Sequence, residues 1–273
     1  MSRLLPSMVA HVGMLWRLKV RPPVKRLVYK LRSRVLYRLA DFYIDTVNND
    51  HDCDFSTNGE AAFVRECLRD AKVVFDIGAA KGTWTELALA ANSELFVHCF
   101  EPASERVKMI EALNFRNRIR LNKVALGESP GAGEMFIEVD GGSNSLFAQR
   151  YGGKGESRLQ TETVPITTID RYCETENVEH VDFIKMDIEG YEMAALRGAQ
   201  RVLKEGRVDV IQFEYSSTFL DAGASLLQLW KYVTELNPAY EFHKIYPDGI
   251  KHVPAYSHEL DNFKTQNWVM IKR

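Results

Sequence analysis

A carboxylate and two glycines follow a short apolar run in the first third of this 273-residue chain. The segment VVFDIGAAKG, residues 73–82, contains Asp76, Gly78 and Gly82. It predicts a buried strand that leads into the N-terminus of a helix, where glycines let the backbone approach a ligand. A carboxylate at that point repels a pyrophosphate and attracts a ligand that carries positive charge. The glycine pattern alone also fits a tight strand-to-helix turn without a ligand.

A second acid ends the next apolar run, FVHCFEP. Glu101 lies about one strand-helix unit further along, where a carboxylate accepts hydrogen bonds from both hydroxyls of a ribose. Its structural alternative is contact with the N-terminus of the helix after Pro102. Acids at two neighbouring strand ends favour a nucleoside with a cationic group. S-adenosyl-L-methionine, with its sulfonium and ammonium groups, is such a ligand.

Three further acids end later apolar runs. Asp187 and Glu189 follow VDFIKM, and Glu214 lies near the end of VDVIQFEY. An alcohol that acts as a nucleophile needs a base in hydrogen-bond reach, or a metal ion that lowers its pKa. These carboxylates suit either task, and spacing alone does not separate a Mg²⁺ site from a bare base. Their structural alternatives are an N-cap for Asp187, a first helical turn for Glu189 and an ion pair with Lys185 for Glu214.

Two other groups could border the same pocket. His243 suits a general base near neutral pH if its segment is a late strand, although a single strand histidine is more often structural. Ser143, Asn144 and Ser145 offer hydroxyl and amide groups to a polyhydroxyl acceptor, or else belong to a plain flexible loop. We expect Trp84 to lie in the core.

Apolar runs and helical segments alternate along the chain, which is typical of parallel strands joined by crossover helices. The runs are VVFDI, LFVHCFEP, IRLNKVAL, VDFIKMDIEG, VDVIQFEY and NWVMIK. The expected helices span 60–68, 84–91, 104–115, 191–204 and 226–236. Between the third and fourth runs, EMFIEVD and TETVPITTID predict short extra strands around a Gly- and Ser-rich loop suited to covering a substrate.

The N-terminal region differs from the rest in charge. Ten basic residues precede the first acid, Asp41. The rest of the chain contains the other 25 Lys and Arg and all 37 Asp and Glu, so its net charge is −12. Apolar residues at helical spacing after Pro23 predict a basic amphipathic helix. We therefore divide the chain into an arm, residues 1–50, and a catalytic domain, residues 51–273.

The arm has several conceivable uses. Through residues 17–43 it could contact an anionic membrane or a glycosyltransferase, or it could cap its own domain. Nucleic acid is excluded as a partner because the acidic remainder offers no second basic face. The first residues weakly resemble a signal peptide, but Pro6 and His11 interrupt the apolar run. The four cysteines are widely spaced and suggest neither a disulfide framework nor a zinc site. We expect a cytoplasmic protein, peripheral at most to the inner membrane surface.

The sequence resembles the FkbM family of S-adenosylmethionine-dependent methyltransferases from about Val73 to the C-terminus. The most specific segment is IKMDIEGYEMAALRGAQRVL, and FDIGAAKG, CFEP, VALGES, GSNSL and VPITTID are similar in the same order. The resemblance implies an α/β, Rossmann-like class I methyltransferase fold with a seven-stranded, mostly parallel sheet whose last strand is antiparallel. It also implies O-methylation of a sugar, glycan or secondary metabolite. Asp76, Gly78, Gly82 and Glu101 are expected to bind the cofactor both from their positions and from the resemblance. The resemblance adds Ala79, Pro102 and Ala125.

Two other functions compete with this interpretation. An NAD(P)-dependent oxidoreductase shares the fold and the acid after the second strand, but this chain has GxxxG rather than GxGxxG, and Asp76 would repel a pyrophosphate. A catalytically silent adaptor, recruited through its arm, is the second alternative. It would be favoured if Asp76→Ala and Asp187→Ala left activity in the cell unchanged while loss of the arm abolished it.

Overall fold

The computed structural model describes residues 26–27, 29, 33–115, 117–138, 144–147 and 159–273. It divides into two compact units, residues 1–48 and residues 49–273. In the first unit, α3 (Arg34–Asn48) is an amphipathic helix without a buried residue. None of the helices described is long and apolar enough to cross a membrane.

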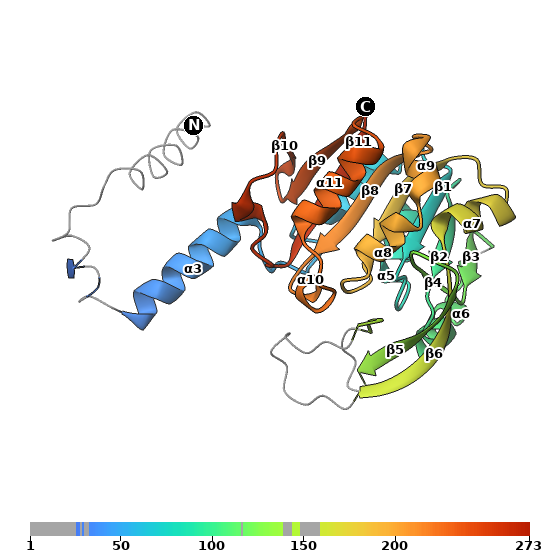
Figure 1. Cartoon of the computed structure of the whole chain (residues 1–273), viewed down its shortest axis with the longest axis horizontal. Helices are drawn as coiled ribbons and strands as arrows, with labels where there is room; N and C mark the ends of the chain where they lie inside the picture. Colours follow the sequence, from blue (N-terminus) through green and yellow to red (C-terminus); the bar gives the residue numbers. More distant parts are fainter. Residues whose placement is uncertain (1–25, 28, 30–32, 116, 139–143, 148–158) are drawn as a thin grey trace. The chain divides into compact units, whose positions relative to one another are not determined.

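The second unit is built on an eight-stranded sheet in the order β10-β9-β11-β8-β7-β1-β2-β3 (Figure 1). Strands β1, β2, β3, β7 and β8 are parallel, whereas β11 runs antiparallel to β8 and β9. The strand order reverses between β1 and β7, so ligands are expected beyond the carboxyl ends of these strands. The strands are β1 (Val73–Ile77), β2 (Phe96–Phe100), β3 (Ile119–Asn122), β7 (Val181–Met186), β8 (Val208–Tyr215), β9 (Tyr240–Tyr246), β10 (Gly249–Val253) and β11 (Gln266–Lys272).

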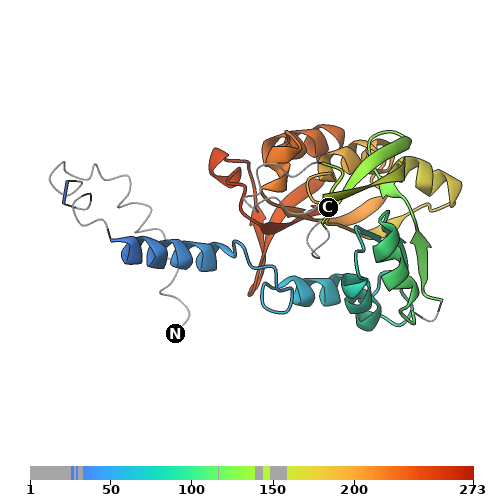
Figure 2. The same cartoon turned by 90° about the horizontal axis from the view of Figure 1, so that it is seen from below.

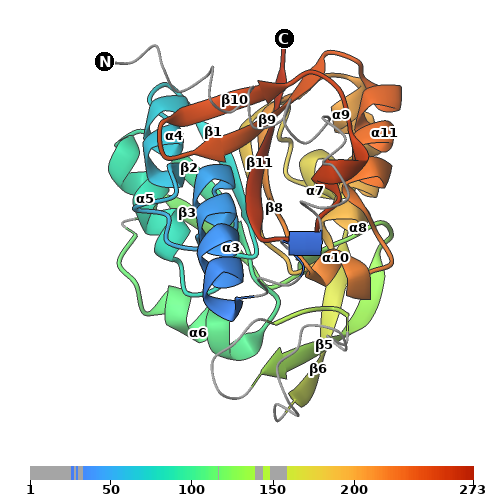
Figure 3. The same cartoon turned by 90° about the vertical axis from the view of Figure 1, so that its left-hand side faces the viewer.

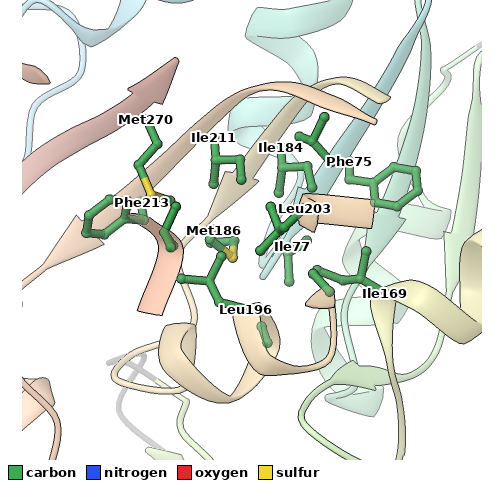
Figure 4. Packing of buried hydrophobic residues seen from close by; sticks show 14 of the residues in the cluster. Phe75, Ile77, Ile169, Ile184, Met186, Leu196, Leu203, Ile211, Phe213 and Met270 are labelled. Atoms are coloured by element: carbon green, nitrogen blue, oxygen red, sulfur yellow. The ribbon is translucent and has the colours of Figure 1, made fainter. Parts of the chain in front are cut away.

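Helices cover both faces of this sheet, as Figure 2 shows. One face carries α4 (Glu60–Cys67), α5 (Thr83–Ala91) and α6 (Ser104–Glu111), and the other carries α7 (Ile169–Thr175), α8 (Glu192–Arg197), α9 (Gln200–Lys204) and α11 (Leu226–Leu236). The connections also include α10 (Thr218–Asp221) and the short 3₁₀ turn η1 (His258–Leu260). The apolar side chains of β1, β7 and β8 pack against α7, α8 and α9 in a buried core (Figure 4). Burial on both sides explains why these strands are continuous apolar runs in the sequence.

A smaller sheet, in the order β4-β6-β5, lies beside the main one. It consists of β4 (Ala125–Leu126), β5 (Gly131–Glu138) and β6 (Leu159–Thr167), and β5 and β6 form a long antiparallel pair (Figure 1). The two extra strands expected around the Gly- and Ser-rich loop are thus present. The run IRLNKVAL, expected as one strand, is divided because β3 pairs with β2 and β4 pairs with β6.

Two expectations about the main sheet need correction. The sheet has eight strands rather than seven, because the segment after β9 turns back at Pro247 and Asp248 and adds β10 as an antiparallel edge strand (Figure 3). Moreover, the helix expected over 191–204 is two helices, α8 and α9. The carbonyl oxygen of Gly198, between them, accepts a hydrogen bond from the Asp170 N–H at 2.9 Å, which ties this break to α7. The antiparallel last strand is as predicted.

Candidate functional site

The carboxyl ends of β1, β2, β7 and β8 bring the predicted acids to one edge of the sheet. Asp76 lies near the end of β1, Glu101 follows β2, Asp187 and Glu189 follow β7, and Glu214 lies near the end of β8. Two cavities of about 330 Å³ and about 230 Å³ open at this edge. The larger is lined by Ile77, Gly78, Ala80, Phe100, Glu101, Pro102, Arg106, Val124, Ala125, Leu126, Met135, Asn144, Leu146, Asp187, Ile188, Glu189 and Tyr191. The smaller is lined by Cys53, Phe55, Glu60, Asp76, Gly78, Ala79, Ala80, Lys81, Thr83, Trp84, Arg106, Lys185, Asp187, Glu214 and Asn267.

Gly78 and Asp187 lie where the two cavities meet, since both residues line both. Gly78 has a φ of 85°, a left-handed conformation that favours glycine. A Cβ atom there would lie 2.1 Å from the carbonyl oxygen of Asp187. The glycine thus allows the turn after β1 to touch the turn after β7, which forms the boundary between the cavities.

Glu101 is a buried carboxylate on the wall of the larger cavity. Its two oxygens accept hydrogen bonds from the N–H groups of Ala80 and Ala103, each at 2.9 Å. Burial raises its pKa to about 7, although these two N–H groups and Arg106 act in the opposite direction. Ala103 is the N-cap of α6, so the expected contact with the helix N-terminus is present together with the position in the cavity wall. Each oxygen retains a lone pair for a ligand hydroxyl.

Asp76 is oriented differently from Glu101. Its Oδ2 accepts a hydrogen bond from the Thr85 hydroxyl at 2.5 Å, and the residue lines the smaller cavity rather than the larger. Burial raises its pKa to about 6, against the effects of Thr85 and Lys185. Asp76 is therefore reached from the smaller cavity and does not form part of the wall that holds Glu101.

A buried lysine lies among these acids. Lys185, the fifth residue of β7, places its Nζ 3.2 Å from Asp187 Oδ2 and 3.9 Å from Glu60 Oε1. Glu60, in the first turn of α4, is itself fixed by a 2.7 Å hydrogen bond from Gln212 Nε2. Burial alone would lower the pKa of Lys185, but Asp187, Glu60 and Glu214 reverse the effect and raise it. Lys185 is therefore a permanent ammonium that balances part of the surrounding negative charge.

Glu214 lines the smaller cavity from β8. Its pKa is raised well above the usual value by burial and then by the nearby charges of Asp187 and Glu189, with Lys185 acting against them. A carboxyl group in this state holds its proton more tightly than an exposed one. It is therefore better matched to proton transfer near neutral pH than an ordinary carboxylate.

The carboxylates do not converge on a common metal position. Among the residues that the structure describes, the group whose ligand atoms are close enough to share an ion consists of His180, Asp182 and Asp209. These lie at the amino ends of β7 and β8, away from the cavities. Asp187 is already paired with the Lys185 ammonium. A Mg²⁺ ion, which the sequence left open as an alternative to a bare base, therefore does not fit the three carboxylates in this arrangement.

The loop expected to bind an acceptor contributes a wall to the larger cavity. Ser145 forms a bridge with Phe136 of β5, and its hydroxyl donates to the carbonyl oxygen of Glu189 at 2.9 Å. Glu189 has a φ of 53°, and the residue lines the larger cavity. Asn144 lines that cavity as well, whereas Ser143 lies outside the described residues. The hydroxyl of Ser145 thus holds the loop against the turn after β7.

Two predicted site residues lie elsewhere. Gly82 lines neither cavity; it is the N-cap of α5 with a φ of 82°, and a Cβ there would lie 2.9 Å from Leu113 Cδ1. It therefore serves the strand-to-helix turn. His243 also lines neither cavity, because it occupies the middle of β9, where its ring lies 5.0 Å from that of His252 on β10. The expectation that His243 borders the pocket is wrong.

Part of the site is not marked by any pattern in the sequence. Glu60 reaches it from α4, far away in the sequence, and no local pattern marks it. Glu192 lines neither cavity but is buried in the first turn of α8, where its Oε1 accepts the Ile188 N–H at 3.0 Å, and burial raises its pKa to about 8. Trp84, expected in the core, stacks on Phe183 but also lines the smaller cavity.

Several solved methyltransferase structures are similar to this chain at low sequence identity. One is an rRNA methylase from Streptococcus thermophilus, with 11% identity, 78% of this chain and 93% of that chain covered and a TM-score of 0.43. A precorrin-6y C5,15-methyltransferase from Geobacter metallireducens matches with 12% identity, 78% and 88% coverage and a TM-score of 0.40. A search of curated proteins finds no match.

The sequence model described as the methyltransferase FkbM domain matches residues 76–244. The matched region begins at the acid in β1 and includes the turns after β2 and β7 that line the larger cavity. It covers more than half of the chain. The chain therefore belongs to the FkbM methyltransferase family.

Proposed function

We propose that this protein is an S-adenosylmethionine-dependent O-methyltransferase that acts on a hydroxyl group of a sugar, glycan or secondary metabolite. The observation that carries the proposal is the position of Glu101 after β2, on the wall of the larger cavity and hydrogen-bonded to Ala80 in the turn after β1. A carboxylate at this point of a doubly wound sheet can accept both ribose hydroxyls of a nucleoside. The four cysteines are free thiols, which supports a reducing, cytoplasmic setting.

The larger cavity suits the nucleoside part of the methyl donor. Ala125 and Pro102, together with Val124 and Leu126, give it an apolar portion that fits an adenine ring beside Glu101. Gly78 and Asp187, at the boundary of the two cavities, would hold the methionine part of the donor. There its cationic groups meet a predominantly negative environment, which stabilises a sulfonium ion.

The smaller cavity suits the acceptor. Its wall combines carboxylates with the Asn267 amide and the Lys185 ammonium, a lining that matches a substrate rich in hydroxyl groups. Because Gly78 and Asp187 line both cavities, an acceptor oxygen in the smaller one can approach the donor methyl group in the larger one. The bond between sulfur and the methyl carbon breaks as the bond from the acceptor oxygen forms, and sulfur keeps the electron pair as a neutral thioether. Positioning of the two reactants supplies much of the rate increase.

The proton of the acceptor hydroxyl passes to a carboxylate. Asp187 and Glu214 both line the smaller cavity, and Glu189 faces the donor side. The raised pKa of Glu214 favours it as the final proton acceptor, while the ion pair with Lys185 fixes the direction of Asp187. Glu60 and Lys185 are thus positioning residues that act through Asp187.

The reaction can be tested with methyl-labelled S-adenosylmethionine and a panel of sugar nucleotides, lipid-linked saccharides and polyketides. We expect label on an oxygen atom of at least one acceptor and unchanged turnover in EDTA. Label on nitrogen would contradict the O-specific part of the proposal. Glu214→Gln should abolish labelling while leaving donor affinity unchanged, because Glu214 does not line the larger cavity.

A further inference from the structure

The helix α3 has a continuous apolar stripe along one side. Leu36, Leu39, Tyr43 and Val47 follow one another at helical spacing, with 63%, 59%, 65% and 46% of their surfaces exposed. Val35 and Phe42 extend the stripe on one flank, with exposed fractions of 66% and 70%. A run of large exposed apolar side chains on this scale indicates an interaction surface.

The opposite side of α3 is polar and nearly neutral. Arg34, Arg38, Asp41, Asp45 and Asn48 repeat at intervals of three and four residues and so form a second stripe. Two arginines and two aspartates leave this stripe without net charge. The two aspartates would be repelled by an anionic surface, so they must face water when the apolar stripe is bound.

Positive charge lies in the sequence immediately before the helix. Residues 1–33 contain eight Lys and Arg and no Asp or Glu. A strongly amphipathic helix next to a polybasic segment is typical of attachment to the surface of an anionic bilayer. A coiled-coil partner would need only a narrow seam, whereas Val35 and Phe42 widen this apolar face.

We infer that α3 lies in the interface of a membrane that contains anionic lipid, with the stripe of Leu36, Leu39, Tyr43 and Val47 among the acyl chains. The basic residues before the helix bind the headgroups. Apolar burial and electrostatic attraction then act together, and neither contribution alone gives stable attachment. The inference does not depend on the methyl-transfer reaction, because it concerns a different unit of the chain.

The test is flotation of the full-length protein with vesicles of phosphatidylcholine, with and without about a quarter phosphatidylglycerol. We expect binding to the anionic vesicles only. Raising the salt from about 0.1 M to about 1 M should weaken it, because the Debye length falls from about 10 Å to about 3 Å. Leu39→Glu should weaken binding about tenfold, since it places a charge in the apolar stripe.

The matched control is Gln200→Glu, which adds the same charge at an exposed position of α9. It should bind the vesicles like the wild type, and circular dichroism should show both variants folded. Absence of binding to anionic vesicles, or equal binding by Leu39→Glu, would overturn the inference. So would a dimer in sedimentation that Leu39→Glu dissociates while vesicles have no effect, because the stripe would then bind a second copy of the chain. Salt-independent binding to neutral vesicles would refute the role of the basic segment.

Discussion

Lys185 Nζ lies 3.2 Å from Asp187 Oδ2, two residues further along the chain and just beyond the end of β7. The lysine is buried and the aspartate is partly exposed to both cavities. A β-strand directs consecutive side chains to opposite faces, so residues two apart point the same way and can pair. The ammonium group therefore holds the carboxylate at the boundary between the proposed donor and acceptor positions.

Replacing this lysine should destabilise the protein. In Lys185→Met, the buried Glu60 and the partly exposed Asp187 lose their shared cation. The free energy of unfolding in urea should fall by about 3 kcal/mol, the low end for a buried pair, because water can still reach Asp187. The control is Lys123→Met, whose exposed ion pair with Glu111 should contribute about 0–1 kcal/mol. Adding Glu60→Gln to Lys185→Met should restore part of the loss. Equal effects of the two lysine substitutions would show that Lys185 contributes no more to stability than an exposed lysine.

Donor binding should depend on the protonation of Glu101. The pKa of about 7 means that the carboxyl group is largely protonated at pH 6 and ionised at pH 8. Only the ionised form accepts hydrogen bonds at both oxygens, so affinity for S-adenosylhomocysteine should rise about tenfold between these pH values. Titration calorimetry should show that Glu101→Gln binds more weakly and has lost this dependence. The same pH dependence in the variant would assign it to another group.

Glu192 should make stability depend on pH in a defined direction. Its pKa is about 8 in the folded protein and near 4.5 when unfolded, so the folded state binds more protons between these values. Wild-type stability should therefore decrease as pH rises from 5 to 8. In Glu192→Gln this decrease should be absent. The free energy of unfolding of the variant, measured in urea, should therefore rise by roughly 2–4 kcal/mol relative to that of the wild type between pH 5 and pH 8. The exposed Glu235→Gln should show no such gain.

Gly78 should not tolerate a side chain. In Gly78→Ala, the new Cβ meets the Asp187 carbonyl oxygen and the residue must keep a positive φ, which should cost roughly 2–4 kcal/mol of stability and abolish binding of S-adenosylhomocysteine. Gly131→Ala is the control, because nothing lies within 4 Å of a Cβ at that position. Unchanged affinity in Gly78→Ala would place the donor away from the boundary between the cavities.

Much of the fold could be predicted from the sequence because its signals are local. The boundaries of α11 agree with the expected 226–236, helped by the Ser225 hydroxyl, which caps the helix by accepting the Gln228 N–H. The parallel strands were visible as apolar runs because helices cover both faces. The edge strand β10 was missed because Ile250 and Val253 are its only apolar side chains and most of the strand is exposed, so no apolar run marks it.

The site was predictable in part for the same reason. Acids at the ends of parallel strands meet at one edge of the sheet, which brings Glu101 and Asp187 to the same cavity. The contact between Glu60 and Lys185 depends on how α4 packs on the sheet, and periodicity says nothing about that. His243 was misplaced because a strand pattern does not show how far a residue lies from the strand end.

Titration calorimetry with S-adenosylhomocysteine, and with NAD as the competing ligand, shows directly whether the larger cavity binds the methyl donor. We expect saturable binding of one S-adenosylhomocysteine per chain and no heat from NAD. Binding of NAD without binding of S-adenosylhomocysteine would contradict this expectation.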